Sequence, residues 1–277
     1  MPIPFNKMFF AQNVMPIPLP EPPDTDPGDP DLSGCAIDTS THPRWNDGGQ
    51  NHYGVDWFGF KLLPSGTRYI GGTDGFVSIG EAARFWMSNK KEVGGAPYFV
   101  RISYDAGEFA LSWNSEWLGF SARCVRDVTS GEESDPDGTI YTDDYTDGSE
   151  NKYDGVKIGN QVWLKKNLIT KKYQNGDDIT TGLNSSQWVQ ATSGAYAIYP
   201  YTIVDGIASA QAMIDAYGIL YNWYAVDNGL VTGSYRVPSD DDWTDLTDYL
   251  ISEYEGLHES NVAMVLKSCR QVNHPLA

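Results

Sequence analysis

Short aromatic and β-branched runs, separated by glycine-containing turns, dominate the first half of this 277-residue chain. Residues of these types favour the half-buried surface of a sheet, and brief glycine-containing connections join neighbouring antiparallel strands. The pattern therefore predicts a small, twisted antiparallel sheet. Its strands are expected at Phe76–Ile79, Tyr98–Ile102, Glu108–Leu111 and Phe120–Val125.

Two short strands are expected early in the second half. Val156, Ile158, Val162 and Leu164 flank a Gly-Asn pair at 159–160. Such a pair between apolar runs is typical of a tight β-hairpin. Because helical patterns follow this hairpin, the chain as a whole is expected to be α+β.

Two helices are expected after the hairpin. Residues 208–225 place apolar side chains on one side of a helix, and Gly229 is a suitable stop. Ser239 is a good N-cap, because the three aspartates that follow it suit the positive end of a helix dipole. Beyond them, apolar residues recur at helical spacing, at Trp243, Leu246, Tyr249 and Leu250.

The charge balance limits the partners of the chain. Its 19 basic and 37 acidic side chains give a formal net charge of -18, so the average surface repels phosphate backbones and anionic lipids. We therefore expect no nucleic-acid partner. No apolar run approaches the length that spans a bilayer, and no membrane insertion is expected.

Residues 1–32 are expected to form an extended N-terminal arm. Residues 15–32 hold most of the clustered prolines, which exclude a helix interior and favour a stiff spacer. A Pro-rich peptide loses little entropy when it docks in a partner's groove. A disordered tail is the alternative. The docking residues would be the large apolar side chains that precede the spacer, namely Phe5, Met8, Phe9 and Phe10.

Residues 128–153 are expected to form an acidic linker, because the stretch is rich in turn formers and carboxylates. Calcium prefers several carboxylate oxygens from one loop, so its aspartates raise the question of a cation site. Their spacing departs from the helix-loop-helix calcium pattern. A solvated loop is the favoured interpretation.

Six blocks of sequence resemble the Fibrobacter succinogenes major paralogous domain, which is abundant in Bacteroidetes and their phages. Three blocks of this chain resemble the opening half of that domain: VKIGNQVWLKKNL (156–168), AYGILYNWYA (216–225) and YRVPSDDDW (235–243). Three other blocks resemble its closing half: FGFKLLPSGTRY (58–69), FWMS (85–88) and GFSARCVRD (119–127).

The closing half comes first in this chain, so the resemblance implies a circular permutation. Residues 33–127 would be the closing half and residues 154–277 the opening half of one domain. The order of helix, Arg-Val-Pro strand and Ser-capped helix is also similar to the C-type lectin-like fold, whose natural ends lie side by side. A linker between neighbouring ends costs little entropy. Pairing of the halves between two chains is the alternative.

Three cysteines cannot all pair within one chain, and their spacing matches no zinc pattern. Undoing the permutation would bring Cys35 and Cys269 to the two sides of one loop, which allows a bridge between them. Buried or idle thiols in a reducing compartment are the default expectation for Cys35, Cys124 and Cys269 alike.

No catalytic constellation is recognisable. The four histidines have no metal-ligand spacing, and neither a nucleophile elbow nor a phosphate loop occurs. Trp45-Asn46-Asp47 repeats the letters of a calcium and sugar motif of C-type lectins, but the usual partner motif is missing. We therefore expect no enzymatic activity, no metal and no cofactor.

Aromatic side chains favour a recognition role. The chain has 9 Trp, 17 Tyr and 10 Phe, and such rings are common anchors of binding surfaces. In retroelement-diversified lectin-like proteins, the corresponding end of the domain holds the variable ligand-binding residues. Packing of these rings on the core is the alternative. By that resemblance, the ligand-binding candidates are Tyr104, Trp113, Asn114 and Trp117.

The resemblance implies a phage virion structural protein, a fibre or decoration of the capsid or tail. Residues 1–32 would anchor it to other virion proteins, and the lectin-like domain would bind a glycan or protein on the host surface. The opening residues lack the features of a secretory signal, so assembly in the host cytoplasm is expected. A bacterial cell-surface or pilus-associated adhesin and a virion adaptor without a receptor role are the alternatives. Whether the chain forms a homotrimer is left open by the sequence, since no heptad pattern specifies a three-stranded coiled coil.

Overall fold

The computed structural model describes residues 41–48, 52, 54–92 and 95–272. Cys35 and the expected arm, with Phe5, Met8, Phe9 and Phe10, lie outside these residues. The described chain forms small antiparallel sheets and four α-helices, which confirms the α+β class but corrects the expected number of helices from two to four. None of the helices in the described residues is both long enough and apolar enough to cross a bilayer.

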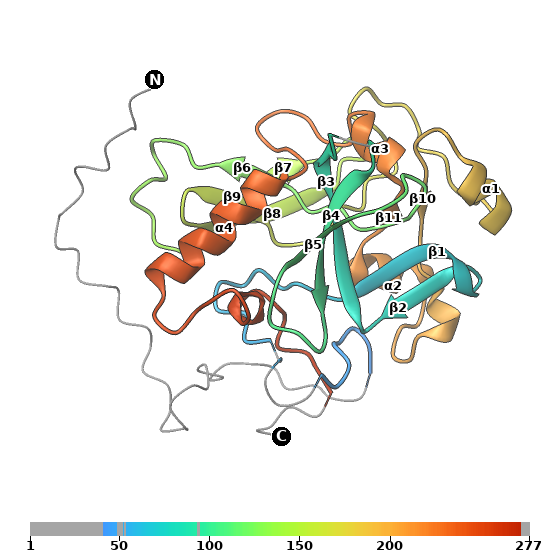
Figure 1. Ribbon diagram of the computed structural model, residues 1–277. Coiled ribbons are helices and arrows are strands. Elements are labelled where there is room, and N and C mark those ends of the chain that lie inside the picture. Colours follow the sequence, from blue (N-terminus) through green and yellow to red (C-terminus); the bar gives the residue numbers. More distant parts are fainter. Residues whose placement is uncertain (1–40, 49–51, 53, 93–94, 273–277) are drawn as a thin grey trace.

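We divide the described chain into an N-terminal segment, residues 41–127, and a C-terminal segment, residues 128–272 (Figure 1). The strands of the N-terminal segment are β1 (Ser65–Thr73), β2 (Phe76–Ile79), β3 (Ala82–Lys90), β4 (Pro97–Ser103), β5 (Ala110–Trp113) and β6 (Val125–Asp127). Those of the C-terminal segment are β7 (Ile140–Thr146), β8 (Lys152–Ile158), β9 (Gln161–Leu164), β10 (Tyr196–Ala197) and β11 (Leu220–Tyr221).

The helices described all belong to the C-terminal segment. They are α1 (Ser185–Gln190), α2 (Ala210–Tyr217), α3 (Trp223–Asp227) and α4 (Asp240–Glu253), with short 3-10 helices η1 (Tyr201–Ile203) and η2 (Val262–Val265). The larger sheets have the strand orders β3-β4-β5 and β6-β9-β8-β7, and β1-β2 and β10-β11 form two-stranded sheets.

Strand β3 is buried on both of its faces. Phe85 and Met87 pack in one core cluster, which also contains apolar side chains of α4 and which we call the first core cluster. Trp86, which lies between them in sequence, packs in another, the second core cluster. Successive side chains of a strand point to opposite faces, so three consecutive large apolar residues require apolar neighbours on both sides. This explains why residues 85–87 form a continuous apolar run instead of alternating with polar residues.

Helix α4 forms as the sequence predicts. The Ser239 side chain accepts a hydrogen bond from the backbone N–H of Asp242, and the Asp242 side chain accepts one from the backbone N–H of Ser239. This reciprocal capping box fixes the start of the helix. Its apolar side packs on the first core cluster, where the rings of Trp243 and Trp163 lie 4.5 Å apart.

The expected helix over residues 208–225 is wrong in its extent. Helix α2 ends at Tyr217 and is capped by Gly218, whose φ of 80° lies in the left-handed region. A Cβ atom on Gly218 would come within 2.6 Å of the Cβ of Asn167, so only glycine fits there. The chain then runs extended through β11 before Asn222 caps α3, because Tyr221 exchanges backbone hydrogen bonds with Phe120.

The expected acidic linker is also corrected, because part of it is a strand. Strand β7 pairs with β8 across residues 140–146. The acidic side chains there are bound: Asp144 accepts hydrogen bonds from Arg126 and Tyr235, at 2.8 and 2.7 Å. Asp137 accepts hydrogen bonds from the hydroxyls of Tyr249 and Tyr254, both at 2.7 Å. These carboxylates organise the connection rather than keep it solvated.

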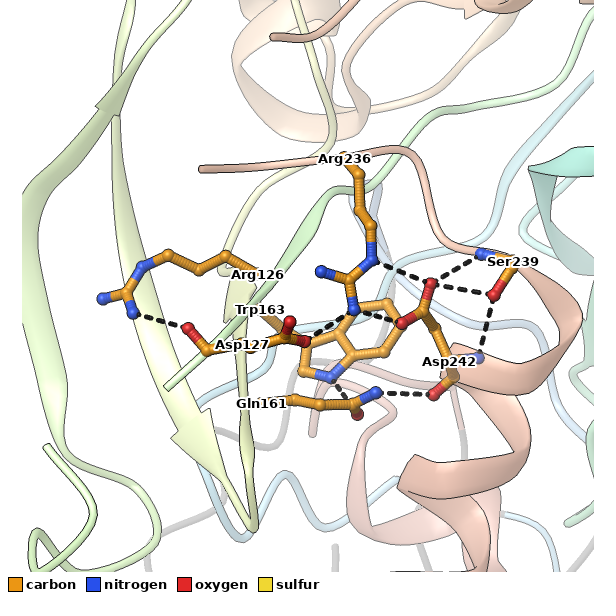
Figure 2. Close-up of polar contacts among 7 residues, drawn as sticks. All are labelled: Arg126, Asp127, Gln161, Trp163, Arg236, Ser239 and Asp242. Atoms are coloured by element: carbon orange, nitrogen blue, oxygen red, sulfur yellow. Dashed lines mark hydrogen bonds and ion pairs between the residues drawn. The ribbon is translucent and has the colours of Figure 1, made fainter. Parts of the chain in front are cut away.

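A polar seam joins the two segments along β6. Strand β6 pairs with β9, and the Arg236 guanidinium lies between Asp127 of β6 and Asp242 of α4 (Figure 2). Gln161 accepts a hydrogen bond from the Trp163 indole and donates one to the backbone carbonyl of Asp242, both at 3.0 Å. Strand pairing and this network therefore hold the end of the N-terminal segment against α4.

Asp242→Asn is expected to lower the free energy of unfolding by about 1–2 kcal/mol at neutral pH, because it weakens both the ion pair and the capping box. Burial alone would raise the pKa of Asp242, but hydrogen bonds from Arg236 and Ser239 lower it below its usual 3.8. The stabilisation is therefore present above that value and is lost as the pH falls through the lowered pKa. The melting temperatures of the parent protein and of Asp242→Asn should therefore converge at acidic pH.

The matched control for this change is Asp241→Asn, an exposed aspartate in the same helical turn. Its melting temperature should stay close to that of the parent protein. An Asp242→Asn variant as stable as this control at neutral pH would contradict a role for the seam in stability.

Candidate recognition surface

Strand β5 leaves apolar side chains open to solvent at the edge of its sheet. Leu111 is 48% exposed and Trp113 is 51% exposed. Strand β7, an edge of the four-stranded sheet, carries charged residues and an irregular register, which are usual protections of an edge strand. Strand β5 has neither a charge nor a register shift. This edge is therefore suited to contact with another molecule.

The Trp113 ring is positioned by Tyr98 of β4 and by Lys91, which directly follows β3. Tyr98 lies directly across from it and meets the ring edge-on, with centroids 6.5 Å apart. The ammonium group of Lys91 lies 4.1 Å from the centroid of the indole, a cation–π contact. The ring is thus oriented although half of its surface remains open.

The loop after β5 is held by Glu116. Its carboxylate accepts hydrogen bonds from the Lys90 ammonium, at 2.5 Å, and from the Tyr224 hydroxyl, at 2.9 Å. Its backbone carbonyl accepts a hydrogen bond from the backbone N–H of Trp223, at 2.8 Å. The hydrogen bond from Lys90 lowers the pKa of Glu116, so the carboxylate stays charged at neutral pH. Both segments therefore fix the conformation of this loop.

The loop ends beside the β1–β2 hairpin. Trp117 stacks on Tyr69 with centroids 5.8 Å apart and an interplanar angle of 27°. Tyr69 is 42% exposed, and the neighbouring Ile70 is 57% exposed. Gly119 and Arg68 exchange two backbone hydrogen bonds of 2.9 Å, which tie the hairpin to the loop. We call the five residues Tyr69, Lys91, Trp113, Asn114 and Trp117 the Trp113 surface.

Three of the four ligand-binding candidates are close in sequence: Trp113 is the last residue of β5, and Asn114 and Trp117 lie in the loop that follows. Trp117 is partly buried and also packs against the second core cluster. Tyr104 does not belong with them. It follows the far end of β4, six residues from Tyr98, which corresponds to roughly 20 Å along an extended strand. Its partly buried side chain packs against the first core cluster, as the alternative interpretation of these rings predicts.

Sequence reasoning missed Lys91, Tyr69 and Glu116. Adjacent lysines at 90–91 gave no distinctive signal, because the chain has two further Lys-Lys pairs, at 165–166 and 171–172. Tyr69 was assigned to a family motif. No local pattern identifies Glu116, because its partner Tyr224 is 108 residues away.

The structure gives no support to a metal site in its described ranges, where no group of three or more His, Cys, Asp or Glu side chains gathers. Trp45 of the lectin-like tripeptide is buried and donates a hydrogen bond to the carbonyl of Leu62, at 3.1 Å. The Asn46 side chain accepts a hydrogen bond from Arg44, at 2.8 Å. Both residues therefore have structural contacts.

The cysteines differ in state. Cys124 is a buried free thiol, and burial raises its pKa well above the usual value. Cys269 is disulfide-bonded, which corrects the default expectation of idle thiols for this residue. Cys35, the partner that the sequence allows for it, lies outside the described residues.

Comparison with known proteins places a family name on the C-terminal segment. No curated protein and no solved structure matches the chain. The family model described as the Fibrobacter succinogenes major domain matches residues 156–272, which include the end of β8, the whole of β9, the helices and the Arg-Val-Pro-Ser motif of the polar seam. The predicted resemblance to the Fibrobacter succinogenes major domain family is therefore confirmed over residues 156–272.

Proposed function

We propose that this chain is a non-enzymatic recognition protein whose Trp113 surface binds a glycan or a protein on a bacterial host cell. The observation that carries the proposal is the contrast between Trp113 and the core tryptophans. Trp86, Trp163 and Trp243 are buried, whereas Trp113 is half exposed at the end of β5, next to a loop that Glu116 holds in place. A preorganised, exposed aromatic ring is typical of an anchor in a binding surface.

The proposed setting is a phage virion, in which the chain would be a fibre or decoration of the capsid or tail. Residues 1–32 would attach it to other virion proteins, with the prolines as a spacer between the anchor and the displayed domain. The occurrence of related domains in Bacteroidetes phages supports this setting.

The proposed architecture is a circularly permuted C-type lectin-like domain. Two observations support it. Motifs of the closing half precede the matched residues 156–272, which is the order that a permutation leaves. In addition, β6, at the end of the N-terminal segment, pairs with β9 near the start of the matched region, as expected for former termini that lay side by side.

A bacterial cell-surface or pilus-associated adhesin is the second candidate, and the disulfide at Cys269 favours it. Disulfides persist mainly in oxidising surroundings such as the periplasm and the cell exterior. The two settings share the recognition surface and differ in what the remaining chain attaches to.

Quantitative mass spectrometry of purified phage particles and of the bacterial envelope separates the two settings. A fixed copy number in particles, including peptides from residues 1–32, is the result expected for a virion protein. Enrichment in the envelope fraction would overturn the virion setting and favour the adhesin.

Trp113→Ala is expected to weaken binding to host cells at least about tenfold, because a central aromatic anchor commonly contributes more than 1.4 kcal/mol. Labelled protein would be titrated onto Bacteroidetes cells that bind the parent protein. The fold should survive, because half of the ring is already in solvent.

The control for this change is Tyr201→Ala, which removes another exposed ring, on η1, outside the Trp113 surface. Its binding should equal that of the parent protein. Equal binding by a folded Trp113→Ala variant would contradict the proposed surface. Absence of cell binding by the parent protein would favour a virion adaptor without a receptor role.

A further inference from the structure

Lys91 is a positive charge that lies over an aromatic ring rather than beside a carboxylate. Its ammonium lies over Trp113, and in the described part of the chain it belongs to no ion pair. Lys90, by contrast, is neutralised by Glu116. The Glu116 carboxylate already accepts hydrogen bonds from Lys90 and Tyr224, so it does not compete for Lys91.

This arrangement stands out against the charge of the whole molecule. A net charge of -18 repels anions from the average surface. An ammonium beside an exposed ring provides a local exception, where an anionic group can form a charge-assisted hydrogen bond. Charge complementarity therefore selects an anionic partner at this site over a cationic one.

The flat ring and its polar neighbour favour a sugar as that partner. A pyranose can stack on an exposed indole, and the flexible Lys91 side chain can move from the ring to an acidic group of the same ligand. The side-chain oxygen of Asn114 (Oδ1) accepts a hydrogen bond from the backbone N–H of Ser115, at 2.8 Å. This bond orients the exposed Asn114 amide, whose two N–H donors suit sugar hydroxyls.

We infer that the Trp113 surface binds acidic glycans, with Trp113 stacking on a sugar ring and Lys91 pairing with the carboxylate of a uronic acid residue. The inference rests on the proposed recognition function and adds the ligand class to it. Neutral glycans would keep the stacking contact and lose the ion pair.

Isothermal titration calorimetry with tetragalacturonate tests this inference, and the same oligosaccharide with its carboxyl groups reduced is the matched ligand. The full chain is expected to bind the acidic form at least about tenfold more tightly. Lys91→Gln should bring the affinity for the acidic form down to that for the reduced form. Lys152→Gln, which removes an exposed lysine on β8, should change neither affinity.

Several outcomes would overturn the acidic-glycan inference and leave the recognition function standing, provided that cell binding still depends on Trp113. They are equal affinity for the two oligosaccharides, no effect of Lys91→Gln, binding of neither oligosaccharide, or equally tight binding of a polyglutamate peptide. Cell binding that does not depend on Trp113 would instead contradict the proposed function itself. The two failures are therefore distinguishable.

Discussion

Arg123→Met is expected to lower the free energy of unfolding by about 3–5 kcal/mol, because it leaves several buried acceptors without a donor. The Arg123 side chain is buried and donates to the carbonyl of Phe60, at 2.6 Å. It also donates to the carbonyl of Leu164, at 3.3 Å, and twice to the side-chain oxygen of Asn167, at 3.0 and 2.8 Å. One side chain of the N-terminal segment thus satisfies acceptors in both segments.

Urea unfolding monitored by tryptophan fluorescence measures this effect. The midpoint should fall while the slope stays constant, since the surface exposed on unfolding does not change. The urea midpoint of Arg123→Lys should lie between those of the parent protein and Arg123→Met, because a single ammonium cannot reproduce the forked donor geometry of the guanidinium. Lys152→Met, which breaks an exposed ion pair with Asp143, should leave the midpoint nearly unchanged. An unchanged midpoint for Arg123→Met would show that the acceptors find other donors.

Lys267→Met is expected to lower the free energy of unfolding by about 3 kcal/mol, since it removes the donor for three backbone carbonyls. The buried ammonium donates to the carbonyls of His52, Ser103 and Ala106, at 3.0, 2.7 and 2.6 Å. It also lies 5.0 Å from the centroid of the Trp45 ring. This residue joins the chain near η2 to two loops of the N-terminal segment.

The effect of Lys267 should depend on pH. Burial lowers the pKa of Lys267 to about 7, from 10.5 in the unfolded chain. Between these values the unfolded state binds more protons than the folded state, so the contribution of this lysine to stability rises with pH. The difference in urea midpoint between the parent protein and Lys267→Met should therefore grow from neutral to alkaline pH. A difference that shrinks would mean that the carbonyls and the ring keep the lysine charged.

Local signals in the sequence were enough to predict α4 and the β8–β9 hairpin. Ser239 and the aspartates after it define a helix start by contacts within one turn, and the Gly159-Asn160 pair defines a turn in the same local way. Strand β3 was not predicted as a strand. Its Phe85-Trp86-Met87 run lacks alternation because both faces of β3 are buried, which only the tertiary structure can reveal.

Long-range contacts explain the remaining errors. The helical pattern across Gly218 is interrupted because Tyr221 pairs with Phe120, about a hundred residues earlier in the chain. The acidic stretch containing Asp137 and Asp144 was interpreted as a linker. Its carboxylates are bound by tyrosines and an arginine that are distant in sequence.

The candidate surface was predictable only in part, for the same reason. Trp113, Asn114 and Trp117 were identified from one aromatic stretch. Tyr104 was included because it is near in sequence, although a strand carries it to the other end of the sheet. Lys91 and Tyr69 join the surface through β3 and the β1–β2 hairpin, which a local pattern does not bring together.

Cleavage of the chain between its two segments is the most direct test of whether both fold as one unit that carries the Trp113 surface. A protease site would be inserted between Glu133 and Ser134, two exposed residues, and the cut protein run on gel filtration under reducing conditions. We expect both pieces to co-elute at the size of the intact 30.7 kDa chain, held by β6–β9 pairing and Arg123. Separate elution of the two pieces, or elution at twice that mass before and after cutting, would contradict a unit formed within one chain.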